Sequence, residues 1–119
     1  MNLRIAPEHI RFRISEQELH HIHQQGSITQ CTRVSDTLSM HYTLELAAST
    51  DRITPALLHL QTRQEERVIG FLLTIGHEAL AQLLSPLQRQ NRIRESLTLA
   101  NGDFLTVDLE VDLHSKKGV

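Results

Sequence analysis

The 119-residue sequence contains few aromatic residues and a single cysteine. Phe, Trp and Tyr together make up 3% of the chain, so the core of the folded protein must be aliphatic. The shortage of aromatic side chains also disfavours surfaces that stack nucleic-acid bases or sugar rings. Because Cys31 is alone, it excludes an internal disulfide, and this fits a reducing compartment.

Long hydrophobic runs are also lacking. No stretch approaches the roughly 18 apolar residues that a membrane-spanning helix requires. Residues 1–5 include Arg4 and lead into no apolar run, so no signal peptide is expected. These absences predict a cytoplasmic protein that does not bind a membrane.

Positive charge is not in excess, because 12 Lys and Arg residues accompany 14 Asp and Glu residues. A nucleic-acid-binding protein neutralises phosphates with Lys and Arg, so this function class gains no support from the charge. The length is typical of one domain. We therefore predict a single strand-rich domain over residues 1–114, followed by a disordered tail at residues 115–119.

A two-residue alternation of apolar and polar side chains is the main signal in the sequence. It is clearest at residues 105–113, where every second residue is Leu or Val and the residues between them are mostly charged. Residues 10–14 show the same alternation with arginines between the apolar residues. The pattern is typical of strands with one buried face. Residues 67–75 differ, because this nearly continuous apolar run predicts a strand that is buried on both faces.

Turn and capping signals divide the strands. Ser15 and Glu18 form a capping box, which predicts a helix over residues 16–25 that Gly26 terminates. Leucines at helical spacing predict a second helix over residues 77–84. The dipeptide at residues 101–102, Asn followed by Gly, predicts a hairpin turn.

Together these elements predict an α+β fold. We expect an antiparallel, β-rich, barrel-like or sandwich-like sheet of seven to eight strands with two short helices. Antiparallel neighbours are favoured because the connections are of hairpin length. The sequence shows no internal repeat.

Three stretches of the sequence resemble a family of small, uncharacterised bacterial proteins of about 120 residues. These stretches are NLRIAPEHIRFRISEQEL near the start, ITPALLHLQ with RVIGFLLTIGHEALAQLL in the middle, and DFLTVDLEVDL near the end. The resemblance covers most of the chain and implies an α+β, barrel-like fold. It implies no known activity, so it assigns no role to any residue.

A histidine-rich helix is the first candidate for chemistry. His20 and His23 lie three residues apart, which places them on one side of the predicted helix. Imidazole is a good ligand for zinc, copper or nickel, so the pair predicts a site for a divalent transition metal if His9, His41 or Glu18 adds a third ligand. The simpler interpretation is a solvated helix face, since a metal site needs three or four convergent ligands.

The second candidate is a row of carboxylates near the end of the chain, formed by Asp108, Glu110 and Asp112. Like charges in one row favour a cationic partner strand. Three arginines near the start of the chain could supply it if the first and last strands pair: Arg4, Arg11 and Arg13. The two sets would then form an ion-pair or anion-binding face on the outside of the sheet. The alternative places the same charges inside a barrel, as in tunnel enzymes that act on triphosphates.

Two weaker features remain. Cys31 with His41 could form a nucleophilic pair, but a buried and inert thiol is the commoner arrangement for a lone cysteine. Arg89, Arg92 and Arg94 form a basic segment that we interpret as a solvated arm of a hairpin rather than as a site for an anionic partner.

These observations favour a non-enzymatic binding or interaction module that self-associates as a homo-oligomer, with a small-molecule ligand that the sequence does not identify. A metal-binding protein and a phosphate-handling enzyme are the alternatives. The face that the carboxylate row occupies distinguishes them, because acids beside arginines on the outside indicate structure or binding, whereas acids around a cavity indicate catalysis.

Overall fold

A computed structural model of the chain describes residues 1–48, 57–85 and 91–112. The elements of these ranges, in chain order, are β1 (Asn2–Ala6), β2 (His9–Ser15), α1 (Glu16–Gln25), β3 (Ser27–Arg33), β4 (Ser39–Leu46), β5 (Leu58–Glu65), β6 (Val68–Ile75), α2 (His77–Leu84), β7 (Arg92–Thr98) and β8 (Phe104–Asp112).

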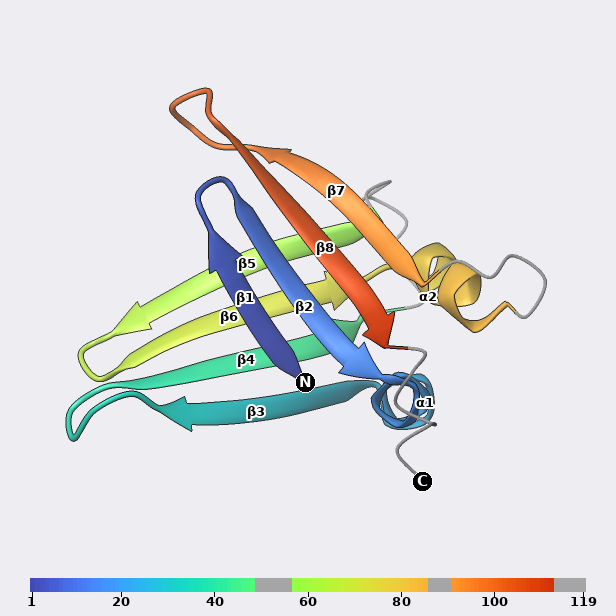
Figure 1. The fold of residues 1–119 in the computed structure, drawn as a ribbon, viewed down its shortest axis with the longest axis horizontal. Coiled ribbons are helices and arrows are strands. Elements are labelled where there is room, and N and C mark those ends of the chain that lie inside the picture. Colours follow the sequence, from blue (N-terminus) through green and yellow to red (C-terminus); the bar gives the residue numbers. More distant parts are fainter. Residues whose placement is uncertain (49–56, 86–90, 113–119) are drawn as a thin grey trace.

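The eight strands form two sheets of four, which confirms the predicted α+β class. Sheet A has the strand order β1-β2-β8-β7 and sheet B has the order β3-β4-β6-β5. The strands of sheet A cross those of sheet B at an angle, and the hairpin turns of the two sheets spread apart (Figure 1). The described strands do not close into a barrel, so the sandwich-like architecture is the correct one of the two expected.

The order of elements is the same in both halves of the chain, although the sequence shows no repeat. Each half runs hairpin, helix, hairpin: β1–β2, α1 and β3–β4 in the first, then β5–β6, α2 and β7–β8 in the second. Sheet A joins the first hairpin of the first half to the last hairpin of the second half, and sheet B joins the two middle hairpins. Neither half therefore completes a sheet without the other.

The two hairpins of each sheet meet through parallel strands. β2 pairs with β8 from His9↔Thr106 onward, and β4 pairs with β6 from Ser39↔Val68 onward. The four hairpins are antiparallel as predicted, but the expectation of antiparallel neighbours is wrong for these two pairs. Parallel neighbours require a long crossover. The crossover between β2 and β8 contains most of the chain. The short connections between consecutive strands therefore do not predict that these two strands are neighbours.

The core lies between the sheets and is aliphatic except for Phe12. Leu109 is fully buried and Val111 is 2% exposed, so the alternation predicted for the last strand is confirmed. The other core residues come from both sheets and both helices: Ile10, Phe12, Ile14, Leu19, Ile22, Leu44, Leu58, Leu73, Ile75, Ala79, Leu80, Leu83, Ile93 and Val107.

Both predicted helices are confirmed, and they lie at the same end of the two sheets (Figure 1). The Ser15 Oγ accepts a hydrogen bond from the Glu18 backbone N–H at 3.1 Å, and the Ser15 backbone N–H donates to Glu18 Oε1 at 2.9 Å. Gly26 ends α1 with φ of 92°, a left-handed conformation that glycine adopts without a Cβ clash. No helix in the described ranges is long and apolar enough to cross a membrane.

Two expectations about sheet B are wrong. Cys31 is exposed on β3 rather than buried. β6 is not buried on both faces, because Leu73 and Ile75 enter the core while Leu72 on the opposite face stays half-buried. Both expectations fail for the same reason: the two helices lie at the end of the sheets, and neither covers the outer face of sheet B (Figure 1). The tail predicted at residues 115–119 and the predicted basic residue Arg89 lie outside the described residues.

Candidate functional site

The outer face of sheet A collects the arginines and carboxylates singled out in the sequence. The parallel register of β2 and β8 places Arg11 opposite Asp108 and Arg13 opposite Glu110. Arg4 on β1 lies beside Arg11 in the same row. The pairing of the first hairpin with the last therefore creates this charged face.

Asp108 is the most enclosed residue of the face. It points away from the core, yet it is 0% exposed because neighbouring side chains cover it. Arg94 Nε donates to Asp108 Oδ1 at 2.7 Å, and Arg94 Nη2 donates to Oδ2 at 3.1 Å. His9 Nε2 lies 2.7 Å from the same Oδ2, and Arg11 Nε lies 3.6 Å from it. The carboxylate thus joins β2, β8 and β7.

Burial alone would raise the pKa of Asp108, but the hydrogen bonds from Arg94 and His9 outweigh it and lower the pKa to about 2. The carboxylate is therefore ionised at neutral pH, and an ionised carboxylate can only accept hydrogen bonds. It follows that His9 Nε2 carries the hydrogen that this contact uses.

Glu110 and Asp112 are more accessible than Asp108. Arg92 Nη2 donates to Glu110 Oε1 at 2.7 Å, and this hydrogen bond is the main cause of the lowered pKa of Glu110. Arg13 lies 3.6 Å from Glu110 and 3.5 Å from Asp112. Exposed pairs of this kind contribute about 0–1 kcal/mol each, so they fix the register of the strands more than they stabilise the fold.

Sequence reasoning missed the contributions of His9, Arg92 and Arg94 to this face. A signal for the two arginines was present, because the Asn–Gly turn at residues 101–102 sets the register of the last hairpin. That register pairs Arg94 with Asp108 and Arg92 with Glu110. His9 carried no comparable signal, since its approach to Asp108 depends on the parallel pairing of β2 and β8.

A small hollow opens on this face beside the ion pairs. It has a volume of about 80 Å³ and is lined by Asn2, Arg4, Arg11, Arg13 and Glu110. Arg4 forms no ion pair with the described part of the chain. Arg11 Nε is buried and has no hydrogen-bond acceptor among the described residues. On the outer face of the four strands, five arginines accompany three carboxylates, so positive charge is in excess.

The carboxylate row does not line a tunnel. Asp108, Glu110 and Asp112 lie on the face of β8 opposite the buried Leu109 and Val111. They therefore face away from sheet B, and the described strands do not close around them. The triphosphate alternative requires acids and bases that face each other across a barrel interior. The described strands do not have this arrangement.

The proposed metal ligands His20 and His23 are both exposed on α1. The Glu18 carboxylate is occupied by the capping box, and His9 contacts Asp108. Across the three described ranges, no three His, Cys, Asp or Glu side chains are placed to hold a metal ion together. Metal binding by His20 and His23 stays a prediction without a third ligand from these residues.

The chain matches a protein-family model over most of its length. The chain belongs to a family of unknown function, DUF7009, whose model matches residues 1–114. This confirms the expected membership of an uncharacterised family. No curated protein and no solved structure matches the chain. The role of each residue must therefore be argued from the geometry of the site.

Proposed function

We propose that this member of a family of unknown function is a non-enzymatic binding module that holds a small oxyanion in the arginine-lined hollow of sheet A. The oxyanion is inorganic phosphate or the phosphoryl group of a larger ligand. Guanidinium groups suit this chemistry, because their planar donors match phosphate oxygens in pairs. The volume of about 80 Å³ suits one such group rather than a whole nucleotide.

The observation that carries the proposal is the supply of unused donors in the hollow. Arg4 has no ion-pair partner in the described chain, and the buried Nε of Arg11 has no acceptor there. An oxyanion in the hollow, beside the guanidinium groups of Arg4 and Arg11, would offset the excess positive charge of this face.

Binding is favoured over catalysis by the state of the carboxylates. Both oxygens of Asp108 already accept hydrogen bonds from Arg94 or His9, and its pKa is about 2. A general base works best with a pKa near the operating pH, so Asp108 is poorly suited to accept a proton. The hydrogen bond from Arg92 lowers the pKa of Glu110 as well.

Calorimetric titration with inorganic phosphate at low ionic strength tests the proposal. We expect the wild-type protein to bind phosphate and Arg4→Gln to weaken the binding about tenfold, which corresponds to loss of one hydrogen bond to a charged group. Arg4 is exposed and unpaired within the described chain, so the variant should keep its stability.

Arg67→Gln is the matched control. Arg67 is exposed at the turn between β5 and β6 and lines no part of the hollow, so removing its charge should leave phosphate affinity unchanged. Absence of binding to the wild-type protein would contradict the proposal. Equal weakening by Arg4→Gln and Arg67→Gln would also contradict it, because it would indicate attraction by net charge alone.

We extend the proposal to location and assembly. The exposed thiol of Cys31 supports a reducing compartment, and hence the cytoplasm. Self-association is supported by exposed apolar side chains on the hairpins of sheet A, since Ile5 is 56% and Phe104 is 62% exposed.

A further inference from the structure

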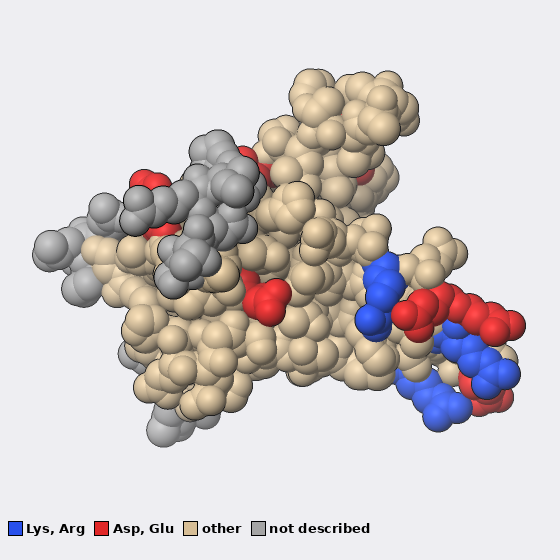
Figure 2. All heavy atoms as spheres, turned by 180° about the vertical axis from the view of Figure 1, so that it is seen from behind, with Lys and Arg blue, Asp and Glu red and all other residues tan. Residues whose placement is uncertain are grey.

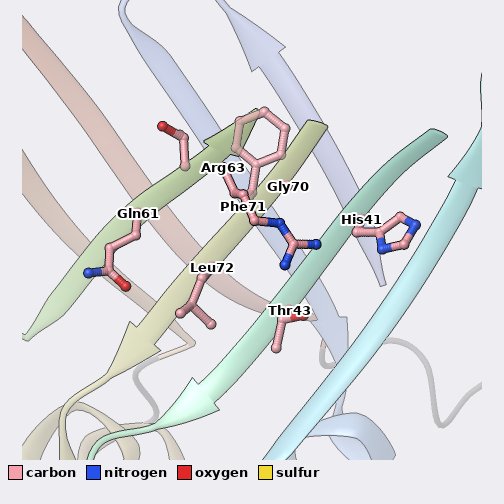
Figure 3. Close-up of a pocket in the computed structure, with 8 residues that line it drawn as sticks. His41, Thr43, Gln61, Arg63, Gly70, Phe71 and Leu72 are labelled. Atoms are coloured by element: carbon pink, nitrogen blue, oxygen red, sulfur yellow. The ribbon is translucent and has the colours of Figure 1, made fainter. Parts of the chain in front are cut away.

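The outer face of sheet B carries a groove that is larger than the hollow on sheet A. Its volume is about 620 Å³, within the usual range for small-molecule sites. Residues of three adjacent strands line it: His41 and Thr43 from β4, Gln61, Thr62 and Arg63 from β5, and Gly70, Phe71 and Leu72 from β6 (Figure 3). The groove lies on the opposite sheet from the arginine-lined hollow.

Strand register explains how the groove forms. One row across the strands contains His41, Gly70 and Arg63, and the next row contains Thr43, Leu72 and Gln61. Gly70 leaves the middle of the first row without a side chain, and the Arg63 side chain extends over β6 in that space (Figure 3). A Cβ placed on Gly70 would lie 3.5 Å from Arg63 Cβ and 3.6 Å from Arg63 Nε.

Among the described residues, the groove is lined by a single charged side chain, which is a cation. Figure 2 shows the molecule from behind: the Lys and Arg side chains in view gather at one end with some of the Asp and Glu side chains, and other acidic side chains lie apart on the remaining surface. Arg63 is the one Lys, Arg, Asp or Glu among the described lining residues. Its Nε lies 3.4 Å from the exposed carboxylate of Glu65, too loose a contact to use all five of its donors. Arg63 can therefore donate hydrogen bonds to an anion that lies in the groove.

An apolar surface lies next to this cation. Leu72 points to the outer face of β6 and is half-buried although no described element covers it. This outer face of β6 is one of the two faces that the apolar sequence of residues 67–75 predicted to be buried. Thr43 and Gln61 flank Leu72 with groups that form hydrogen bonds. The groove thus combines one cation, an apolar floor and a few polar groups, as ligand sites commonly do.

We infer that this groove binds a small organic anion with an apolar body, such as an aromatic or branched carboxylate. The anionic group pairs with the guanidinium of Arg63, and the apolar body lies over Gly70 and Leu72. Thr43 and Gln61 orient the ligand by hydrogen bonds. A second copy of the chain fits less well, because Leu72 is the one large aliphatic side chain in the two outward rows, too few for a stable protein interface.

Amide-resolved NMR titration with 2-naphthoate tests the inference. The amide signals of Thr43, Gly70 and Leu72 should shift, and Arg63→Gln should weaken the binding about tenfold. The uncharged analogue 2-naphthalenemethanol should bind at least tenfold more weakly than 2-naphthoate. Arg67→Gln, at the turn of the same hairpin but outside the groove, should leave the affinity unchanged.

Gly70→Val gives an independent test. Valine is favoured in strands, so the variant should fold, and its methyl groups would occupy the space that Arg63 and the ligand share. We expect it to abolish binding of 2-naphthoate. Three results would overturn the inference: no shifts, equal binding of the uncharged analogue, or shifts confined to sheet A. The last would indicate the arginine-lined hollow instead, so this inference and the phosphate proposal fail separately.

Discussion

At the scale of single residues, Asp108 shows how an outward-facing side chain becomes buried. Strand alternation directs it away from the core, and the sequence predicts as much. Its burial comes from Arg94, Arg11 and His9, which close over it from the neighbouring strands. Alternation along one strand predicts the direction of a side chain, but the accessibility of that side chain depends on the strands beside it.

The lowered pKa of Asp108 predicts a specific pH dependence of stability. The pKa in the folded protein is about 2, below its ordinary value of 3.8. Asp108 therefore stabilises the fold above about pH 4, and this contribution is lost as the pH falls toward 2. The size of the shift corresponds to about 2 kcal/mol. Asp108→Asn should lower the free energy of unfolding by this amount at pH 7, as measured by urea denaturation.

The same measurement as a function of pH supplies the control. Wild type and Asp108→Asn should converge near pH 2, where the wild-type carboxylate is becoming protonated. Glu110→Gln removes a carboxylate that is less enclosed and should cost less at pH 7. A constant difference between wild type and Asp108→Asn from pH 7 to pH 2 would show that its charge does not stabilise the fold.

At the scale of elements, the helices and turns that depend on residues close together in the sequence were predictable. The bounds of α1 follow from the capping box and Gly26, and the last hairpin follows from its Asn–Gly turn. The exposed face of β6 and the exposed Cys31 were predicted wrongly. Their environments depend on where the helices lie, and a strand's own residues do not specify which elements cover it.

The capping box of α1 predicts a measurable contribution to stability. Ser15→Ala removes the acceptor for the Glu18 backbone N–H and should cost about 1 kcal/mol in the free energy of unfolding. Ser27→Ala, at the exposed start of β3, is a matched substitution and should have little effect. Thermal or urea denaturation compares the two. Equal effects would mean that the cap does not stabilise the helix.

At the scale of the whole molecule, the chain is interlocked. The first and last hairpins complete sheet A, and the two middle hairpins complete sheet B. The sequence predicted that the arginines near the start would pair with the carboxylates near the end if the terminal strands were neighbours. Arg11 and Arg13 form such ion pairs, whereas Arg4 forms none with the described carboxylates. The sequence did not predict the hollow, whose lining combines residues of β1, β2 and β8 and so depends on the complete sheet.

A crystal structure of the protein grown with tungstate would show whether the hollow on sheet A holds an oxyanion. Tungstate resembles phosphate in shape and charge, and its anomalous scattering locates it without ambiguity. We expect an anomalous peak within hydrogen-bond distance of Arg4 and Arg11 that disappears in Arg4→Gln crystals. A hollow without tungstate, in crystals that bind the ion elsewhere on the protein, would contradict it.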